Sequence, residues 1–417
     1  MDQSSILVIQ HAAQLVSSSS NGRPRRGKEM ADLTILADAA LVIENGSITW
    51  VGSTKQLPEI PNSAQVIDAT GKTVLPGLVD SHTHLVWTGS REAEFEQRLQ
   101  GKTYQEIAAA GGGINATVAS VRQASKEQLK TAMRRRLERL LRFGVTTVEV
   151  KSGYGLNLAD EVKCLEAIGE LNGEGPLELV PTFLGAHAVP PEFRHDQTGY
   201  VDLLMRQMLP QIAKQKLAEF CDVFCETGVF SVAESDRILK TARDLGFQLK
   251  VHADELTPLG GAELAARLGA VSADHLLCIT DAGIDALADS RTVATLLPAT
   301  AFFLSMDYAP ARRLLERGVA VALASDCNPG TCPSENLPLA GTMACTQMKM
   351  LPAEVLTALT VNAAAALDRA DRIGSLEVGK QADVIICDVS NYGQLFYHFG
   401  VSHVWRVIKR GRVVFAA

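Results

Sequence analysis

The chain has 417 residues, of which 47% are hydrophobic and 21% are charged, an ordinary composition for a globular protein. Its formal net charge of −7 gives no general attraction to nucleic acid, and no apolar run approaches the ~20 residues of a membrane-spanning helix. Because the first residues lack a secretory signal and the 8 cysteines are scattered without a CxxC pair, we expect a cytoplasmic protein with reduced thiols and no membrane partner.

Short strands are expected at both ends of the chain. Before residue 74 the strand-like segments are Ile6–Ile9, Ala40–Glu44 and Ser47–Val51, and Asn45-Gly46 supplies a tight hairpin turn. After residue 370 the strand-like segments are Asp383–Cys387, Val404–Lys409 and Val413–Phe415. Neither end is long enough for a core of its own, so we expect residues 1–74 and 370–417 to form one composite β domain.

Residues 75–369 alternate between apolar strands and amphipathic helices. Apolar residues recur at helical spacing in segments such as 126–142, 159–171 and 231–245. The strand candidates are Val74–Val79, Thr146–Val150, Glu178–Phe183, Asp222–Glu226, Gln248–Val251, Ala270–Ala273, Thr292–Leu297 and Ala320–Ala324. Strands that alternate with helices form a parallel sheet, and eight of them predict an α/β protein with a closed (β/α)8 barrel of the TIM type.

Polar side chains follow the predicted barrel strands at the points where these strands end. They are His82 and His84 after the first strand, Tyr154 after the second, His187 after the third, His252 after the fifth, His275 after the sixth and Asp326 after the eighth. The carboxyl ends of barrel strands carry the chemistry of this architecture, so we expect these side chains to converge. A His-x-His pair alone is a weak signal, although its imidazoles share one face of the chain, and the later strand ends strengthen it.

Part of this set suits a metal ion. The candidate ligands are His82, His84, His252 and Asp326. Imidazoles with one carboxylate suit Zn²⁺, and Fe²⁺ is also chemically reasonable. Such an ion lowers the pKa of bound water and polarises a carbonyl group. A carboxylate beside the water would move its proton, for which Asp326 and Glu255 are both candidates, and His275 would hydrogen-bond the oxygen that becomes anionic.

Each of these residues also has a non-functional interpretation. A single buried histidine is more often a core residue than a ligand, so His187, His252 and His275 carry weight only as a group. Asp254 and Asp274 flank histidines of the predicted site. For these two carboxylates we favour capping of a helix or pairing with a cation over a role in the site.

The long loop after the first barrel strand holds further candidates. Its Arg91 is interpreted as a substrate contact rather than an ordinary surface cation, because it lies above the predicted metal ligands. Tyr104 and Gly111–Gly113 lie in the same loop, where the glycines either open a helix or hinge a lid. Cys327 invites a nucleophile hypothesis, but we favour a small residue in a tight turn because no activating partner is visible.

The chain resembles the amidohydrolase superfamily along nearly its whole length. The segments that carry this resemblance are Pro76-Gly-Leu-Val-Asp-Ser-His-Thr-His84 and Gly374-Ser-Leu-Glu-Val-Gly-Lys-Gln-Ala-Asp383, with the later His and Asp residues. It implies a barrel with a small β-sandwich domain built from both termini. Members with two metals bridge them through a lysine of strand four, and Cys221–Glu226 has no lysine, which argues for one divalent metal per chain.

Within that superfamily the chain is similar to the imidazolonepropionases. The matching segments are Leu85–Arg91, Tyr104 with Gly111–Ile114, Glu149–Gly155, Phe183–Pro190, His252–Glu255 and Asp326–Gly330. That family hydrolyses 4-imidazolone-5-propanoate to N-formimino-L-glutamate in histidine degradation, with one bound Zn or Fe. The resemblance therefore implies a small-molecule partner with a carboxylate tail, and it also implies a homodimer.

The same resemblance assigns roles to single residues. It implies metal ligation by His82, His84, His252 and Asp326, and contacts with substrate or product by Arg91, Tyr104, Tyr154, His187, Glu255, Asn328, Gly330 and Thr331. A propionate tail needs a cation, and Arg91 is the natural anchor, to which Tyr154 and His187 can add donors.

Two other functions stay open. One is another cyclic amidase or deaminase, acting on a hydantoin, pyrimidine or purine; such substrates lack a propionate, so Arg91 would have no partner. The other is a metal-free scaffold that kept only the fold. A scaffold of that kind would be expected to have lost ligands, and all four candidate ligands are present.

Overall fold

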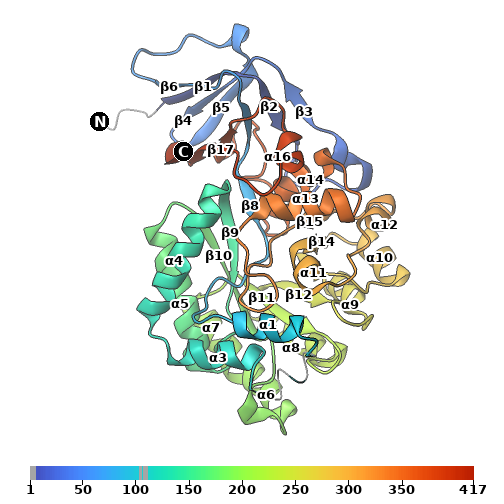
Figure 1. The fold of residues 1–417 in the computed structure, drawn as a ribbon. Helices are drawn as coiled ribbons and strands as arrows, with labels where there is room; N and C mark the ends of the chain where they lie inside the picture. Colours follow the sequence, from blue (N-terminus) through green and yellow to red (C-terminus); the bar gives the residue numbers. More distant parts are fainter. Residues whose placement is uncertain (1–5, 103–105, 107–110) are drawn as a thin grey trace.

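The computed structural model describes residues 6–102, 106 and 111–417, so the predicted contact residue Tyr104 lies outside the described part of the chain. Figure 1 shows the sheets formed by the chain ends together at the top of the view, with the barrel and its helices below them. The predicted α/β architecture, a barrel with additional sheets built from both termini, is confirmed.

Eight parallel strands form the barrel sheet in chain order. They are β8 (Leu78–Asp80), β9 (Val145–Lys151), β10 (Glu178–Ala186), β11 (Phe220–Cys225), β12 (Gln248–Ala253), β13 (Ser272–His275), β14 (Val293–Leu296) and β15 (Val321–Leu323). The first and last strands meet just beyond their ends, where the backbone N–H of Asp326 donates to the carbonyl of His82 and that of His84 donates to the carbonyl of Cys327, each at 3.0 Å. This contact closes the barrel at its carboxyl end, beside the predicted metal ligands.

Helices cover the outside of the barrel. Those that contact its strands include α4 (Lys126–Arg142), α5 (Leu158–Glu174), α8 (Val232–Asp244), α9 (Gly261–Leu268), α12 (Ala311–Glu316), α14 (Pro352–Leu359) and α15 (Val361–Ala365). The other helices of the described chain include α1 (Glu92–Leu99), α3 (Ile114–Gln123), α6 (Gln197–Leu203), α7 (Leu209–Gln215), α10 (Asp281–Ala288), α11 (Pro298–Leu304), α13 (Leu337–Gln347) and α16 (Gln394–Tyr397). In the part of the chain that the structure describes, no helix is both long and apolar enough to cross a membrane.

The helix α4 shows how the sequence fixes these elements. Its first turn is closed by a capping box, in which Ser125 accepts from the backbone N–H of Gln128 while the Gln128 side chain accepts from the N–H of Ser125. Leu129, Met133 and Leu140 recur at helical spacing and are buried against the barrel core. The prediction of a helix over residues 126–142 is confirmed at both ends.

The remaining strands form two sheets. The four-stranded sheet contains β5 (Ser47–Ser53), β4 (Ala39–Glu44), β1 (Ile6–Ala12) and β6 (Gln65–Asp68), in that order. The six-stranded sheet contains β18 (Arg412–Ala416), β17 (Val404–Lys409), β16 (Val384–Cys387), β7 (Thr73–Pro76), β2 (Gln14–Ser17) and β3 (Thr34–Leu36). One hydrophobic cluster, which includes Ile9, Leu41, Val74 and Ile386, draws side chains from both sheets. The two sheets therefore pack on a shared core, as in a sandwich.

The predicted single strand Val74–Val79 is wrong in one respect, because the structure divides it at Gly77. Up to Pro76 the chain pairs with β16 and belongs to the six-stranded sheet, whereas from Leu78 it pairs with β9 in the barrel. A Cβ on Gly77 would lie 2.4 Å from Oγ1 of Thr146, so only glycine fits the crossing point. Pairing with β16 runs through Thr73–Pro76. The domain boundary expected at residue 74 stays a prediction.

Candidate metal centre

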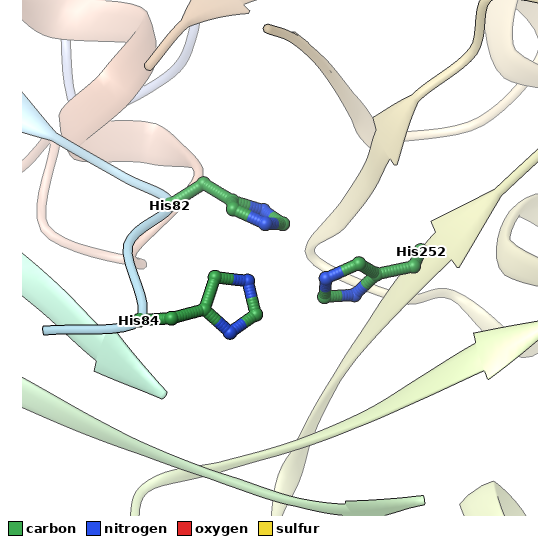
Figure 2. Close-up of side chains that lie close together, drawn as sticks. All are labelled: His82, His84 and His252. Atoms are coloured by element: carbon green, nitrogen blue, oxygen red, sulfur yellow. The ribbon is translucent and has the colours of Figure 1, made fainter. Parts of the chain in front are cut away.

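Three histidines from two strand ends meet inside the barrel. His82 and His84 follow β8, and His252 lies in β12. Their imidazoles point into the same space (Figure 2), and one nitrogen from each lies within 4.8 Å of the others. All three side chains are buried, and Nε2 of His82 and of His252 has no hydrogen-bond partner. Buried nitrogens are rarely left unpaired, so this cluster fits a bound metal ion.

Asp326 completes the group that the sequence predicts. Its Oδ1 atom lies 3.6 Å from Nε2 of His82 and 3.4 Å from Nε2 of His84. Its Oδ2 atom accepts a hydrogen bond from Oγ1 of Thr300 at 2.7 Å, which leaves Oδ1 directed at the histidines. The backbone of Asp326 adopts φ 53°, a conformation that is costly outside glycine and is found at functional sites. The structure therefore brings the four predicted ligands together.

The histidines are oriented by two carboxylates that the sequence analysis did not assign to the site. Oδ2 of Asp274 lies 2.7 Å from Nδ1 of His82, and Oδ2 of Asp222 lies 2.9 Å from Nδ1 of His252. The Asp274 contact is a hydrogen bond with Nδ1 of His82, whereas Nδ1 of His252 lies close to the Asp222 carboxylate without hydrogen-bond geometry. Both contacts leave Nε2 for a metal, which is the common arrangement around metal-ligating histidine. Helix capping or ion pairing was the expected role of Asp274, and this interpretation is incomplete, because Asp274 also holds His82.

Electrostatics favour neutral imidazoles at His82 and His84, which follow the first barrel strand. Burial, together with neighbouring positive charge, holds the pKa of His82 and of His84 well below the ordinary range. Burial also acts against protonation of His252, but the carboxylate of Asp222 outweighs it and raises the pKa of His252. A metal binds the neutral imidazole, so protonation of His252 competes with metal binding.

A second group of possible ligand atoms, formed by His82, Glu149 and Asp274, does not fit a metal. The ammonium of Lys151 already lies 2.9 Å from Oε1 of Glu149 and 3.7 Å from Oδ2 of Asp274. Burial opposes this charge, but Asp222, Glu149 and Asp274 outweigh burial and raise the pKa of Lys151. The ammonium group of Lys151 thus already supplies the positive charge at this position.

The predicted proton-moving groups surround the metal centre. Oε1 of Glu255 lies 3.6 Å from Nδ1 of His275, and the His275 ring lies 5.1 Å from that of His252. Burial, and after it the charge of Asp326, raises the pKa of Glu255 to about 8. Burial likewise raises the pKa of Asp326 to about 6. Perturbed carboxyls in a buried polar cluster are typical of groups that exchange protons in catalysis.

Tyr154 and His187 form one wall of the site. The His187 ring stacks on that of His84 with centroids 5.1 Å apart, and Tyr154 lies 5.3 Å from His187. The carbonyl of Gly153 accepts from Nδ1 of His187 at 3.1 Å, which fixes the tautomer of this ring. Burial lowers the pKa of His187 to about 3, so its imidazole is neutral. Both residues are therefore near the predicted ligands, while their contacts with substrate stay predictions.

Arg91 lies where the loop after β8 meets the loop after β15. Its guanidinium donates to Oε2 of Glu94 from Nε at 3.0 Å and from Nη2 at 2.7 Å. A Cβ on Gly330 would lie 2.2 Å from Nη1 of Arg91, so glycine at 330 makes room for this side chain. Burial, and after it the charge of Asp326, raises the pKa of Tyr154, and the charge of Arg91 opposes this rise.

The side chain of Asn328 organises its own loop. Its amide nitrogen donates to the carbonyl of Asp326 and to Oγ1 of Thr331, both at 2.7 Å. Its amide oxygen accepts from the backbone N–H of Gly330 at 2.8 Å and of Thr331 at 2.7 Å. The structure thus gives Asn328 a structural role next to Asp326, and the predicted substrate contacts of Asn328, Gly330 and Thr331 stay predictions.

Cys327 and Asp254 have the environments that their non-functional interpretations require. Cys327 is fully buried at the closure of the barrel, and burial raises the pKa of its thiol well above the usual value. A reactive thiolate is therefore disfavoured. Asp254 accepts from the backbone N–H groups of Gly261 and Ala262 at the start of α9, each at 3.0 Å.

Comparison with known proteins gives the same picture. The model of the amidohydrolase family matches residues 73–414. An imidazolonepropionase of Geobacillus kaustophilus is 51% identical over 98% of this chain and 97% of its own length, and one of Treponema denticola is 53% identical over 90% and 91%. Among solved structures, a triazine hydrolase variant superimposes with a TM-score of 0.78 at 18% identity, covering 98% of this chain and 94% of its own, which shows the shared fold. The chain therefore belongs to the amidohydrolase family and, within it, to the imidazolonepropionase group.

Proposed function

We propose that this protein hydrolyses the cyclic amide of 4-imidazolone-5-propanoate to N-formimino-L-glutamate, a step of histidine degradation. The observation that carries the proposal is the 51% identity, over 98% of the chain, to a protein named imidazolonepropionase. The convergence of His82, His84, His252 and Asp326 supports it, because opening a stable amide ring at neutral pH calls for an activated water.

The residues that would hold the metal are the three histidines and Asp326. When bound, the metal would lower the pKa of a water molecule and polarise the ring carbonyl. Zn²⁺ suits this donor set and Fe²⁺ is an alternative, and we propose one ion per chain, because Lys151 already supplies the positive charge beside Glu149 and Asp274.

The remaining steps belong to the side chains of this protein. Asp326 or Glu255 would take a proton from the attacking water and return it to the ring nitrogen as the carbon–nitrogen bond breaks. His275 would donate a hydrogen bond to the carbonyl oxygen as it becomes anionic. Arg91 would pair with the propionate tail of the substrate, with Tyr154 and His187 as further donors.

The decisive experiment compares ring substrates on the purified protein. Loss of imidazolone propionate and formation of formiminoglutamate should be followed beside a tail-less imidazolone, a hydantoin, a dihydropyrimidine and guanine. We expect hydrolysis of imidazolone propionate to be the fastest by far. Preferential turnover of one of the other rings would replace the proposal with the cyclic amidase or deaminase alternative. The homodimer and the cytoplasmic location stay predictions, which gel filtration with light scattering and cell fractionation would check.

A further inference from the structure

One fully buried lysine links Asp222 and Asp274, the two carboxylates that contact the histidines of the candidate metal centre. Nζ of Lys151, in β9, lies 2.7 Å from Oδ2 of Asp222 and 3.7 Å from Oδ2 of Asp274. The same nitrogen donates to Oε1 of Glu149 at 2.9 Å. The side chains of all four residues are fully buried, so water does not screen these contacts.

Each of the two carboxylates holds a different part of the metal centre. Asp274 contacts Nδ1 of His82, which follows the first barrel strand, and Asp222 contacts Nδ1 of His252, which lies in the fifth. These two histidines carry the buried Nε2 atoms that have no hydrogen-bond partner. Their relative orientation therefore depends on where Asp222 and Asp274 stand with respect to each other.

We propose that Lys151 is the positioning residue of the metal centre, because its ammonium joins Asp222 and Asp274 and thereby sets the two imidazoles that face the ion. This inference rests on the metal site of the proposed function. Without the ammonium, two buried carboxylates would face each other with no cation between them, and at least one would have to move or take up a proton. Either change would release its histidine from the orientation that presents Nε2 to the metal.

The barrel supplies a matched control for this lysine. Lys250, in β12, is also fully buried and also forms a salt bridge with Glu149, at 3.1 Å. Its other contacts are the carbonyls of Ser81 at 3.0 Å and Ala366 at 3.3 Å, and no described salt bridge joins it to Asp222 or Asp274. Removing either lysine leaves a cavity and takes one of two cations from Glu149. Burial raises the pKa of Asp274 and the charge of Lys250 acts to lower it, but of the two lysines only Lys151 forms described salt bridges with Asp222 and Asp274.

The test compares Lys151→Met with Lys250→Met in the full-length protein. The readouts are Zn²⁺ affinity by competition with a chromogenic chelator, the visible spectrum of the Co²⁺-loaded protein, and the melting temperature of the metal-free protein. We expect Lys151→Met to lose Zn²⁺ affinity by about 10- to 100-fold, the usual effect of changes around metal ligands, and to alter the Co²⁺ spectrum. Lys250→Met should lose comparable thermal stability while its affinity and spectrum stay close to those of the native protein.

Equal Zn²⁺ affinity in the two variants, whether both fall or neither does, would overturn the inference. If the methionine variants do not fold, Lys151→Gln and Lys250→Gln carry the same comparison with a smaller loss of polarity. A native protein that binds no divalent metal would overturn both this inference and the proposed function. A native protein that binds metal but does not open imidazolone propionate would overturn the proposed function alone, so the two failures are distinguishable.

Discussion

The carboxylate of Glu161 accepts a hydrogen bond from the backbone N–H of Gly155 at 2.7 Å, and both residues are buried. The same carboxylate accepts from the N–H of Leu156 at 2.9 Å and from that of Gly153 at 3.1 Å. A Cβ on Gly155 would lie 2.5 Å from the backbone nitrogen of Glu161, so the loop and the first turn of α5 are in close contact. Glu161 thus fixes the loop that carries Tyr154 and the carbonyl that orients His187.

The first prediction follows from this contact. Glu161→Ala should lower kcat/KM for imidazolone propionate by about 10- to 100-fold, because hydrogen bonds to a charged group contribute roughly 1.5–3 kcal/mol each and tenfold in rate is about 1.4 kcal/mol. Metal content should stay at the native value, since no predicted ligand lies in this loop. Steady-state kinetics and elemental analysis check both statements. Glu166→Ala, on the partly exposed side of the same helix, is the control and should change neither. Loss of metal in Glu161→Ala would contradict the assignment.

The second prediction concerns removal of the metal. A chelator should abolish activity and added Zn²⁺ should restore it, with one ion per chain by elemental analysis. His252→Ala should lower both metal occupancy and turnover, because it removes one of three converging imidazoles. His195→Ala changes an exposed histidine outside the site and should leave both at the native level. Full activity of His252→Ala would remove His252 from the ligand set, and two ions per chain would refute the single-metal proposal.

The third prediction separates the two candidate bases. Asp326→Asn should lose activity even in preparations that retain metal, since the carboxylate would contact both ion and water. Glu255→Gln should lose ~10²–10⁴-fold in kcat if Glu255 moves protons, the usual range for general acid–base catalysis. Metal content should be measured for each variant, so that loss of the ion is not mistaken for loss of the base. A change confined to KM in Glu255→Gln would make Glu255 a substrate-binding residue.

The fourth prediction concerns stability in acid. Burial alone would raise the pKa of Glu178, but Arg369, which donates to it at 2.9 Å, and Lys409 outweigh burial and lower this pKa from 4.5 to about 2. Because the folded pKa is the lower one, the stabilisation is fully present above pH 4.5 and is lost as the pH falls toward 2. A shift of this size corresponds to about 3 kcal/mol of unfolding free energy.

Urea unfolding of the metal-free protein between pH 2 and 7 checks this prediction, since metal release then contributes nothing. Glu178→Gln should be less stable than the native protein at neutral pH, and the difference should shrink in acid. A difference that stays constant across this range would show that the native pairing of Glu178 does not depend on its charge.

The sequence predicts the barrel and the four candidate ligands because both are local signals. An apolar strand and the polar residue at its end are adjacent in the chain, so the strand-end rule locates His82, His252 and Asp326 without knowledge of the closed fold. The division of the strand at Gly77 escapes this reasoning, because the pairing partners of Pro76 and Leu78 lie far away in sequence.

The residues around the ligands could not be predicted in the same way. Asp274 meets His82, and Lys151 meets Asp222, only after the barrel has closed, so no spacing in the chain encodes these contacts. One usable signal was present. Lys151 and Asp222 are charged residues in strands that are almost entirely buried, and a charge in a buried strand must have a partner. Such charges mark a polar network, although the sequence does not say which residues it connects.

The last prediction concerns the propionate and is the most discriminating for the proposed function. Arg91 uses Nε and Nη2 on Glu94, while Nη1 lies against Gly330 in the loop that follows the predicted metal ligand Asp326. A guanidinium held in this way is oriented before substrate arrives, and it still has donors for a carboxylate. Arg91→Met should weaken binding of imidazolone propionate by about tenfold to a few hundredfold, because a charge-assisted hydrogen bond contributes roughly 1.5–3 kcal/mol.

The control lies in the substrate. A tail-less imidazolone should already be a poor substrate for the native protein, and Arg91→Met should hardly change its kcat/KM, since there is no carboxylate to lose. The four values of kcat/KM form a double-mutant cycle between the protein cation and the substrate anion, and the coupling free energy measures this contact alone.

A further variant, Glu94→Gln, extends the cycle. It should reduce the coupling free energy without abolishing it, because Arg91 keeps its charge but loses the carboxylate that orients it. If Arg91→Met impairs both substrates equally, Arg91 is structural and the tail must bind elsewhere. If the native protein prefers the tail-less ring, the proposed substrate is wrong and the cyclic amidase alternative takes its place.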